Sequence, residues 1–239
     1  MIITAHQPAY MPWLGYFHKL SLSDLYVILD DVQLERNSFT RRNNIIFSQG
    51  TLMLTVPVFM KGHREKKIRD IQIDNSENWK RKHLNSLRMS YSKHPFFECY
   101  FPWLVNFFDK DWKYLTDITI EMLHFFLKEL VIDVQILKQS DLNVSSYKQD
   151  LILELCKVCN ADTYISGIMG KDYLDDFLFK TNNINVYYQD YKHPEYRQLN
   201  NYPFISHLGI IDLLMNVGGV DAKQIILSGN IDKSYFNEL

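Results

Sequence analysis

The chain has 239 residues, of which 46% are hydrophobic and 23% are charged, a composition typical of a globular protein. A chain of this length can bury a sizeable core, so its folding needs no metal ion or disulfide staple. Its 26 basic and 28 acidic residues give a net charge of −2, which excludes a global positive field that would attract nucleic acid or an anionic membrane.

The N-terminal segment is predicted to form a strand, a helix and a second strand. Ile2–Ala5 is a short apolar run, and two prolines punctuate the loop before the helix predicted over Trp13–Leu22. Leu25–Leu29 is a continuous apolar run that ends at two aspartates. Such a run is typical of a strand buried on both faces of a parallel sheet, and the connection length suits a right-handed crossover.

The start of the chain also indicates the cellular compartment of the protein. Met1–Ile3 leads directly into His6 and the two prolines, so we expect no signal peptide. Charged residues interrupt the apolar stretches before they reach the roughly 18 residues that a transmembrane helix requires. We therefore expect a cytoplasmic protein without a membrane span.

The middle of the chain is predicted to change from loops and strands to helices. Arg36–Asn44 has the composition of a polar, basic loop, and Gly62–Lys67 that of a charged, mobile turn. Strands are predicted over Leu52–Val58 and, from alternating apolar and polar residues, over Ile68–Ile73. Helices rich in aromatic residues are predicted over Glu77–Tyr91, Phe96–Phe108 and Trp112–Leu130.

The rest of the chain predicts strands that alternate with helices. These elements are expected at Val134–Leu137, Ser145–Asn160, Thr163–Ile165, Gly170–Phe177, Val186–Tyr188 and Ser206–Val217. The pattern predicts an α/β fold with a mostly parallel, Rossmann-like sheet. We expect one domain over residues 1–239, with a helical insertion over residues 77–130.

The three cysteines, Cys99, Cys156 and Cys159, are too few and too scattered for a disulfide framework, which favours a reducing compartment. The last two would share one face of the predicted helix. No second pair completes a zinc site, so we expect core positions and no bound metal.

His6 is the first candidate for chemistry. It should lie at the carboxyl edge of the first strand, where open α/β sheets bind ligands. The helix that begins near Pro12 would direct its positive dipole end to the same crevice. A histidine there can act as a general base or bind an anion. The structural alternative is a hydrogen-bonded histidine beside a rigid proline turn.

Asp30, Asp31 and Gln33 follow the second strand and should reach the same edge of the sheet. Adjacent side chains on an extended backbone point to opposite sides, so the two carboxylates are not expected to act as a pair. One of them could orient His6 or a substrate group. The structural alternative is that aspartate simply favours turns after strands.

Two further segments could bind phosphate. Arg36–Asn44 holds three arginines among Asn, Ser and Thr, which suits bidentate binding of phosphate or carboxylate. Tyr164–Tyr173 combines a strand, a glycine loop and Lys171, but it lacks the spacing of a P-loop. A solvated loop and a tight glycine turn, respectively, are the structural alternatives.

The last constellation is His193–Gln198, followed by His207, Asp212 and Asn216. Asp212 and Asn216 are four residues apart on a predicted helix that is otherwise apolar. Buried polar groups need hydrogen-bond partners, so Asn216 could equally hold a neighbouring loop.

Several of these motifs resemble the WbqC-like family of bacterial surface-polysaccharide proteins. The resemblance begins with His-Gln-Pro-x-Tyr-x-Pro-Trp-Leu-Gly-Tyr-Phe at residues 6–17 and continues with Asp-Asp-Val-Gln at residues 30–33. Further matching segments are Arg42–Ile45, Leu54–Val58, Trp79, His83, Tyr164–Tyr173, His193–Gln198 and Ile210–Gly218. Because the motifs run from end to end of the chain, the resemblance is specific.

The resemblance implies a role in O-antigen, capsule or flagellar glycan synthesis, in which an acyl or aminoacyl group is attached to a nucleotide-linked amino sugar. In this interpretation His6 deprotonates the sugar amine, and Asp30 or Asp31 orients it. An acyl-CoA or acyl-carrier-protein thioester would be the co-substrate, with no tightly bound cofactor. A carrier protein and a second copy of the chain are the expected protein partners.

Side chains from all of these motifs would bind the substrate. Arg42, Asn43 and Lys171 would hold the diphosphate or the pantetheine phosphate. Trp13 and Tyr16 would stack on a base or a sugar. The other predicted contacts are Gln7, Tyr10, Gln33, Ser166, Gly167, Tyr173, His193, Tyr196, Gln198, Asp212 and Asn216.

Two other functions are compatible with the sequence. A strand, a turn with Gln-Pro, a helix and a second strand also open nucleotidylyltransferases with a His-x-x-His motif. This chain has His6 but Ala9 at the second histidine position, which weakens nucleotidyl transfer and a related ATP-dependent amide ligase. A non-catalytic protein that binds a carrier protein or a glycan is the third hypothesis.

Overall fold

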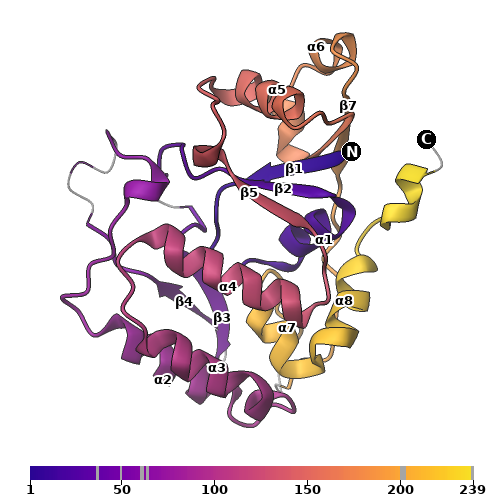
Figure 1. The fold of residues 1–239 in the computed structure, drawn as a ribbon. Coiled ribbons are helices and arrows are strands. Elements are labelled where there is room, and N and C mark those ends of the chain that lie inside the picture. The colour runs from indigo at the N-terminus through magenta and orange to yellow at the C-terminus, as the bar shows by residue number, and fades with distance from the viewer. Residues whose placement is uncertain (36–37, 49, 60–61, 63–64, 200–202, 238–239) are drawn as a thin grey trace.

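The computed structural model describes residues 1–35, 38–48, 50–59, 62, 65–199 and 203–237 (Figure 1). Its main strands are β1 (Ile2–His6), β2 (Leu25–Ile28), β5 (Gln135–Lys138), β6 (Thr163–Gly167) and β7 (Asn185–Gln189). They form one parallel sheet in the order β5-β2-β1-β6-β7. The predicted α/β class with a parallel sheet is confirmed.

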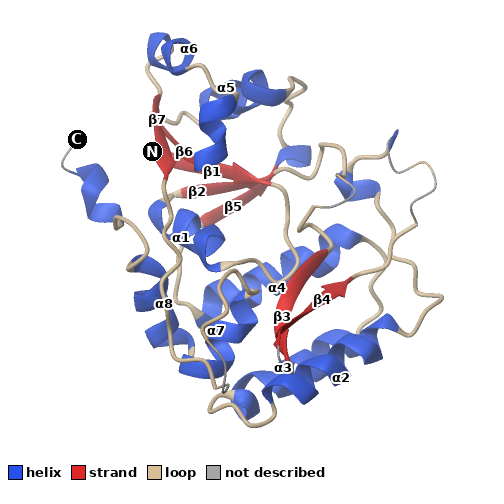
Figure 2. Ribbon diagram, turned by 180° about the vertical axis from the view of Figure 1, so that it is seen from behind, coloured by secondary structure: helices blue, strands red, loops and turns tan. Residues whose placement is uncertain are grey.

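Helices cover both faces of the parallel sheet. The helix α1 (Leu14–Leu22) follows β1, while α5 (Lys148–Val158) and α6 (Asp176–Thr181) flank β6 in the chain. Figures 1 and 2 show α5 and α6 on one face and α1 on the other. The strands therefore need apolar residues on both faces: Val27 packs in the cluster with α5, and Tyr26 packs in the cluster with α1.

The strand order creates a crevice beside β1. From β1 the chain moves outward to β2 and β5, and it then returns to place β6 on the other side of β1. The connections after β1 and after β6 lie on opposite faces of the sheet, so the chain diverges at the carboxyl ends of these two strands (Figure 2). Open α/β sheets bind ligands at such a switch point.

A second layer of structure packs below the sheet in Figure 1. It contains an antiparallel hairpin, β3 (Arg42–Phe47) and β4 (Gly50–Thr55). The helices around it are α2 (Trp79–Tyr91), α3 (Phe97–Asp109), α4 (Leu115–Glu129), α7 (Ile210–Val217) and α8 (Gly219–Leu227). The three aromatic helices predicted from the sequence are α2, α3 and α4, with ends that differ by up to three residues.

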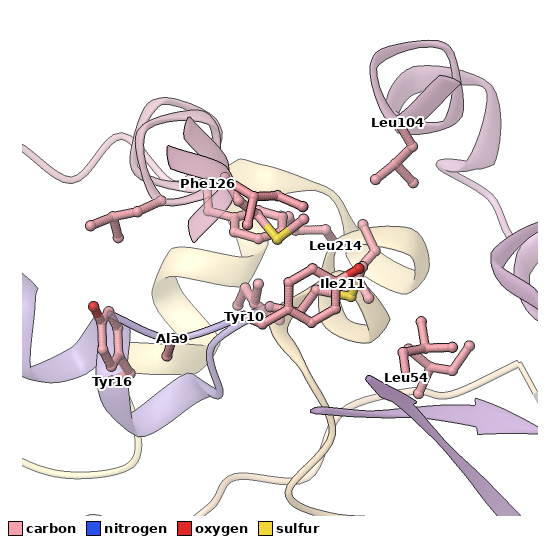
Figure 3. Packing of buried hydrophobic residues seen from close by; sticks show 14 of the residues in the cluster. Ala9, Tyr10, Tyr16, Leu54, Leu104, Phe126, Ile211 and Leu214 are labelled. Carbon is pink, nitrogen blue, oxygen red and sulfur yellow. The ribbon is translucent and has the colours of Figure 1, made fainter. Parts of the chain in front are cut away.

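The core of this layer is built around the loop after β1. Figure 3 shows Tyr10 among residues from α3, α4, α7 and β4, including Leu54, Phe126 and Ile211. Tyr10 is fully buried, and its hydroxyl forms a hydrogen bond of 2.9 Å with Nδ1 of His83. The loop after β1, which carries part of the motif at residues 6–17, is thus held in place by the core on one side.

The structure corrects several predicted elements. Arg36–Asn44 was predicted as a loop, and its first two residues lie outside the described part of the chain. β3 begins at Arg42 because its polar residues pair with β4. Ile68–Ile73 was predicted as a strand, but Ile68–Asp70 is a 3-10 turn. Its apolar and polar residues predicted a strand, but in the described part of the chain only isolated bridges pair this segment.

The ends of two predicted helices also change. The segment predicted as Gly170–Phe177 is a 3-10 turn over Ile168–Asp172 followed by α6, which Asp175 caps through the amides of Phe177 and Leu178. The last predicted helix starts at Ile210, not at Ser206. Part of the predicted turn Gly62–Lys67 lies outside the described residues.

The helices are short. The longest among the described residues, α4, has 15 residues, and no helix in this part of the chain is long and apolar enough to cross a membrane.

Cys156 lies on α5 in the core cluster, where burial raises the pKa of its thiol to about 12.

Candidate functional site

A cavity of about 610 Å³ lies at the carboxyl ends of β1, β6 and β7, at the switch point of the sheet. This volume is within the range of small-molecule sites. Seven residues predicted to form the site line the cavity: His6, Trp13, Tyr16, Ser166, Gly167, Tyr173 and His193. The structure therefore brings together residues of three motifs that lie far apart in the sequence.

His6, the last residue of β1, is half-buried and lines the cavity. Its Nδ1 lies 2.8 Å from the carbonyl oxygen of Gln7. Because a carbonyl only accepts, Nδ1 carries the proton and donates it, and Nε2 of the neutral ring keeps a lone pair. Burial, followed by the positive charge of Lys19, lowers the pKa of His6 to about 3, so the ring is neutral at neutral pH.

Aromatic rings fix the orientation of His6. The ring centroids of Trp13 and Tyr16 lie 5.5 and 5.3 Å from that of His6, both in edge-to-face geometry. The hydroxyl of Tyr26 donates a hydrogen bond of 3.1 Å to the carbonyl oxygen of His6. The backbone and the ring of this histidine are thus both held in place.

Lys19 on α1 also lines the cavity, although no motif singled it out. Its side chain is only 5% exposed, and burial lowers the pKa of its amine to about 8. It follows Gly15 by four residues, so both lie on the helix face that borders the cavity. The sequence feature that could have identified Lys19 is its position four residues after Gly15, a glycine of the N-terminal motif.

The end of β7 forms a rigid wall against α1. The amide of Gln189 donates to the carbonyl oxygen of Gly15 at 3.0 Å and to Nδ1 of His18 at 2.6 Å. The ring of Tyr191 lies across Gly15, where an added β-carbon would be 2.9 Å from its Cδ1. Gly15 is therefore required for close contact between the helix and this wall.

The end of β6 contributes Ser166 and Gly167 to the cavity, whereas Lys171 in the turn that follows does not line it. A β-carbon on Gly170 would lie 1.9 Å from Oγ of Ser166, so this glycine lets the turn close over the serine. The Nζ of Lys171 lies instead 5.6 Å from the ring centroid of Tyr188. Burial raises the pKa of Tyr173, which keeps its hydroxyl protonated.

Two histidines from the C-terminal part of the chain complete the wall. His193 and His207 have ring centroids 5.0 Å apart, and both line the cavity. Nδ1 of His193 donates to the carbonyl oxygen of Pro194 at 3.0 Å. Burial, then the charge of His207, lowers the pKa of His193.

The two aspartates expected beside His6 have other partners. Asp30 is buried and accepts hydrogen bonds from the amide and the hydroxyl of Ser140, at 2.9 and 2.7 Å. Asp31 forms ion pairs with Lys67 and Arg69. Asp31 and Gln33 line a separate cavity of about 370 Å³. The aspartates are at the predicted edge of the sheet, but they do not contact His6.

Four other predicted residues do not line the cavity, and three of them hold the loop after β1. Gln7 accepts a hydrogen bond from the hydroxyl of Thr40, and Tyr10 is in the core. The amide of Asn43 donates to the carbonyl oxygen of Met11, which has a φ of 46°. Arg42 lies on β3, opposite Thr55.

The remaining predicted residues form one buried polar network. Asp212 accepts hydrogen bonds from the hydroxyls of Tyr91 and Tyr196, and from the amide of Gln198, at 2.7 to 3.1 Å. Asn216 accepts from the backbone amide of Leu199 at 2.8 Å. The network fastens the segment after His193 to α7, which supports the cavity wall from outside.

The described part of the chain contains no candidate metal site. Within it, no three His, Cys, Asp or Glu side chains gather closely enough to hold a metal ion. The cavity instead combines a neutral histidine, a lysine, hydroxyl groups and aromatic rings.

The WbqC-like protein family model matches residues 7–224 of the chain. The chain is also 31% identical over 214 residues to the uncharacterized protein Rv1507c of Mycobacterium tuberculosis, which covers 89% of this chain and 92% of that one. No solved structure matches the chain significantly. The matched region contains every wall segment of the cavity except the end of β1.

Proposed function

The chain belongs to the WbqC-like protein family, and on that premise we propose that it transfers an acyl or aminoacyl group to a nucleotide-linked amino sugar for a bacterial surface polysaccharide. The acyl donor would be a thioester, either acyl-CoA or an acyl-carrier protein. The cavity at the switch point would hold the amino sugar.

The observation that supports this proposal is the hydrogen bond from Nδ1 of His6 to the carbonyl oxygen of Gln7. It leaves Nε2 as the nitrogen with a lone pair in a residue that lines the cavity. A neutral, oriented imidazole has the lone pair that general-base catalysis requires. Its lowered pKa makes it a weak base, which a bound anion beside Lys19 would strengthen by raising that pKa.

In the proposed reaction the sugar amine attacks the thioester carbonyl while Nε2 of His6 takes a proton from the attacking nitrogen. A C–N bond forms, and the C–S bond then breaks. The protonated imidazole returns the proton to the leaving thiolate, so that His6 ends the cycle neutral. The aromatic rings of Trp13 and Tyr191 would stack on the sugar or the base.

The test is thiol release from an acyl thioester in the presence of nucleotide-linked amino sugars. We expect His6→Gln to lower turnover by about 10²- to 10⁴-fold, because glutamine cannot accept the proton. His124→Gln is the matched control, since His124 is exposed on α4. Circular dichroism should show that both variants are folded.

Full turnover in folded His6→Gln would contradict the role of His6 as a base. Pyrophosphate release from ATP or CTP, without thiol release, would instead favour nucleotidyl transfer or an ATP-dependent ligase. Binding of a carrier protein without either reaction would favour an accessory protein.

A further inference from the structure

Lys19 has an unusual environment for a lysine. It lies on α1, the residue is only 5% exposed, and it lines the cavity. Two of its neighbours in the cavity wall are aromatic, Tyr16 and Tyr191. The ammonium group is therefore removed from bulk water but open to a ligand.

No protein group neutralises this charge in the part of the chain that the structure describes. The ion pairs there all involve other basic groups, and only the backbone carbonyl of Lys19 takes part in a side-chain hydrogen bond, with Ser23. Asp190 also borders the cavity, but it is exposed and forms no ion pair with Lys19.

A buried ammonium without a counter-charge destabilises the folded protein, whereas a ligand anion at the same place would be strongly attracted. The amine is still largely protonated at pH 7, since burial lowers its pKa only to about 8. His6 is neutral and donates its proton to Gln7, so it does not compete for an anion.

We propose that Lys19 binds an anionic oxygen group of the ligand, a phosphate or a carboxylate, inside the cavity beside His6. This inference deepens the proposed function and rests on it for the placement of the substrate. It also gives the anion a second effect. The positive charge of Lys19 contributes to the lowered pKa of His6, and an anion on Lys19 would offset that contribution.

The test measures binding directly and needs no turnover. Inorganic pyrophosphate and acetate are titrated into the protein, and thermal unfolding and calorimetry report binding. We expect at least one of them to stabilise the natural chain and to bind about 10-fold or more weakly to Lys19→Met, which lacks the charged donor. The anion that acts identifies the ligand group as phosphate or carboxylate.

Lys157→Met is the matched control, since Lys157 is exposed on α5 away from the cavity and its replacement removes the same charge. This variant should bind the anion like the natural chain. Lys19→Met should also unfold at a higher temperature than the natural chain when no anion is added, because methionine does not bury a charge. If Lys19→Met does not fold, Lys19→Gln replaces it in the same binding measurements.

Equal anion binding by the natural chain and Lys19→Met, or no binding by either, would overturn the inference. Anion binding that depends on Lys19, without acyl transfer, would support the inference and contradict the proposed function. Acyl transfer that is unchanged in Lys19→Met would support the proposed function and contradict the inference about Lys19.

Discussion

Asp212 and Lys19 are both buried charged residues, but their surroundings differ. Asp212 is fully buried and accepts three hydrogen bonds, whereas the ammonium of Lys19 has no protein partner among the described residues. Buried charges that serve the fold are normally satisfied by the protein itself. The contrast separates a residue that stabilises the structure from one that is available to a ligand.

Replacement of Asp212 should be strongly destabilising. Asp212→Leu would leave the hydroxyls of Tyr91 and Tyr196 without their carboxylate acceptor, and the amide of Gln198 would lose one of its acceptors. We expect a loss of about 3 kcal/mol or more in the free energy of unfolding, measured by urea denaturation. Asp221→Leu, at an exposed position, should stay within about 0.5 kcal/mol of the natural chain. Similar losses in both variants would show that the network contributes nothing.

The sequence predicted the positions of several residues better than it predicted their contacts. His6, Trp13 and Tyr16 line the cavity as expected, because strand, turn and helix follow each other within a short segment. Asp30 did not reach His6, because its partner Ser140 lies 110 residues away and carries no motif. Lys19 was overlooked because a single lysine on a short helix is normally solvated.

At the scale of elements, local apolar runs were sufficient to predict β1, α1 and β2 within one residue at each end. The strand β3 was missed because its first residues, Arg42–Asn44, are polar and form a strand only by pairing with β4. Ile68–Ile73 is the opposite case, because it was predicted as a strand but has no neighbouring strand to pair with among the described residues and begins as a 3-10 turn. Tertiary pairing, which the pattern does not contain, decides both cases.

The junction between α4 and α8 depends on a glycine. A β-carbon on Gly219 would lie 2.0 Å from the backbone carbonyl oxygen of Glu129, which cannot move away as a side chain could. Gly219→Ala should therefore separate the two helices and lower the free energy of unfolding by about 1–3 kcal/mol. Urea denaturation measures this change.

Gly50→Ala is the control for that experiment, because a β-carbon there meets no atom within 4 Å. If Gly219→Ala unfolded at the same urea concentration as the natural chain, the close contact between α4 and α8 would be wrong.

At the scale of the whole molecule, stability should rise with pH in two ranges. Burial lowers the pKa of His6 to about 3 and that of His83 to about 4. The unfolded chain, with histidine pKa values of about 6.5, therefore binds more protons than the folded chain between about pH 4 and 6.5. The free energy of unfolding should fall by a few kcal/mol (roughly 1.4 kcal/mol per pKa unit and group) as the pH drops through this range.

Lys19 gives the same sign between about pH 8 and 9, because the pKa of its amine is about 8 in the folded chain and about 10.4 in the unfolded one. Above this range the raised pKa of Cys156 has the opposite sign, since the folded chain keeps a thiol proton that the unfolded chain loses. Urea denaturation from pH 4 to about pH 9 therefore measures both ranges. His83→Gln should flatten the acid range and Lys19→Met the alkaline range, while His124→Gln should alter neither. If none of these variants changed the pH profile, the pH dependence of stability would not come from His83 and Lys19.

The position of β1 in the sheet also has a consequence for the order of folding. β1 pairs with β2, which follows directly after α1 in the chain, but its other neighbour is β6, and the hydrogen bond from Thr4 to Ile165 spans 161 residues. At synthesis rates of roughly 5–20 residues per second, β1 waits on the order of ten seconds or more for that neighbour. During this time one edge of an apolar strand stays unpaired and open to association with other chains. The central strand is thus the segment of the nascent chain most in need of protection.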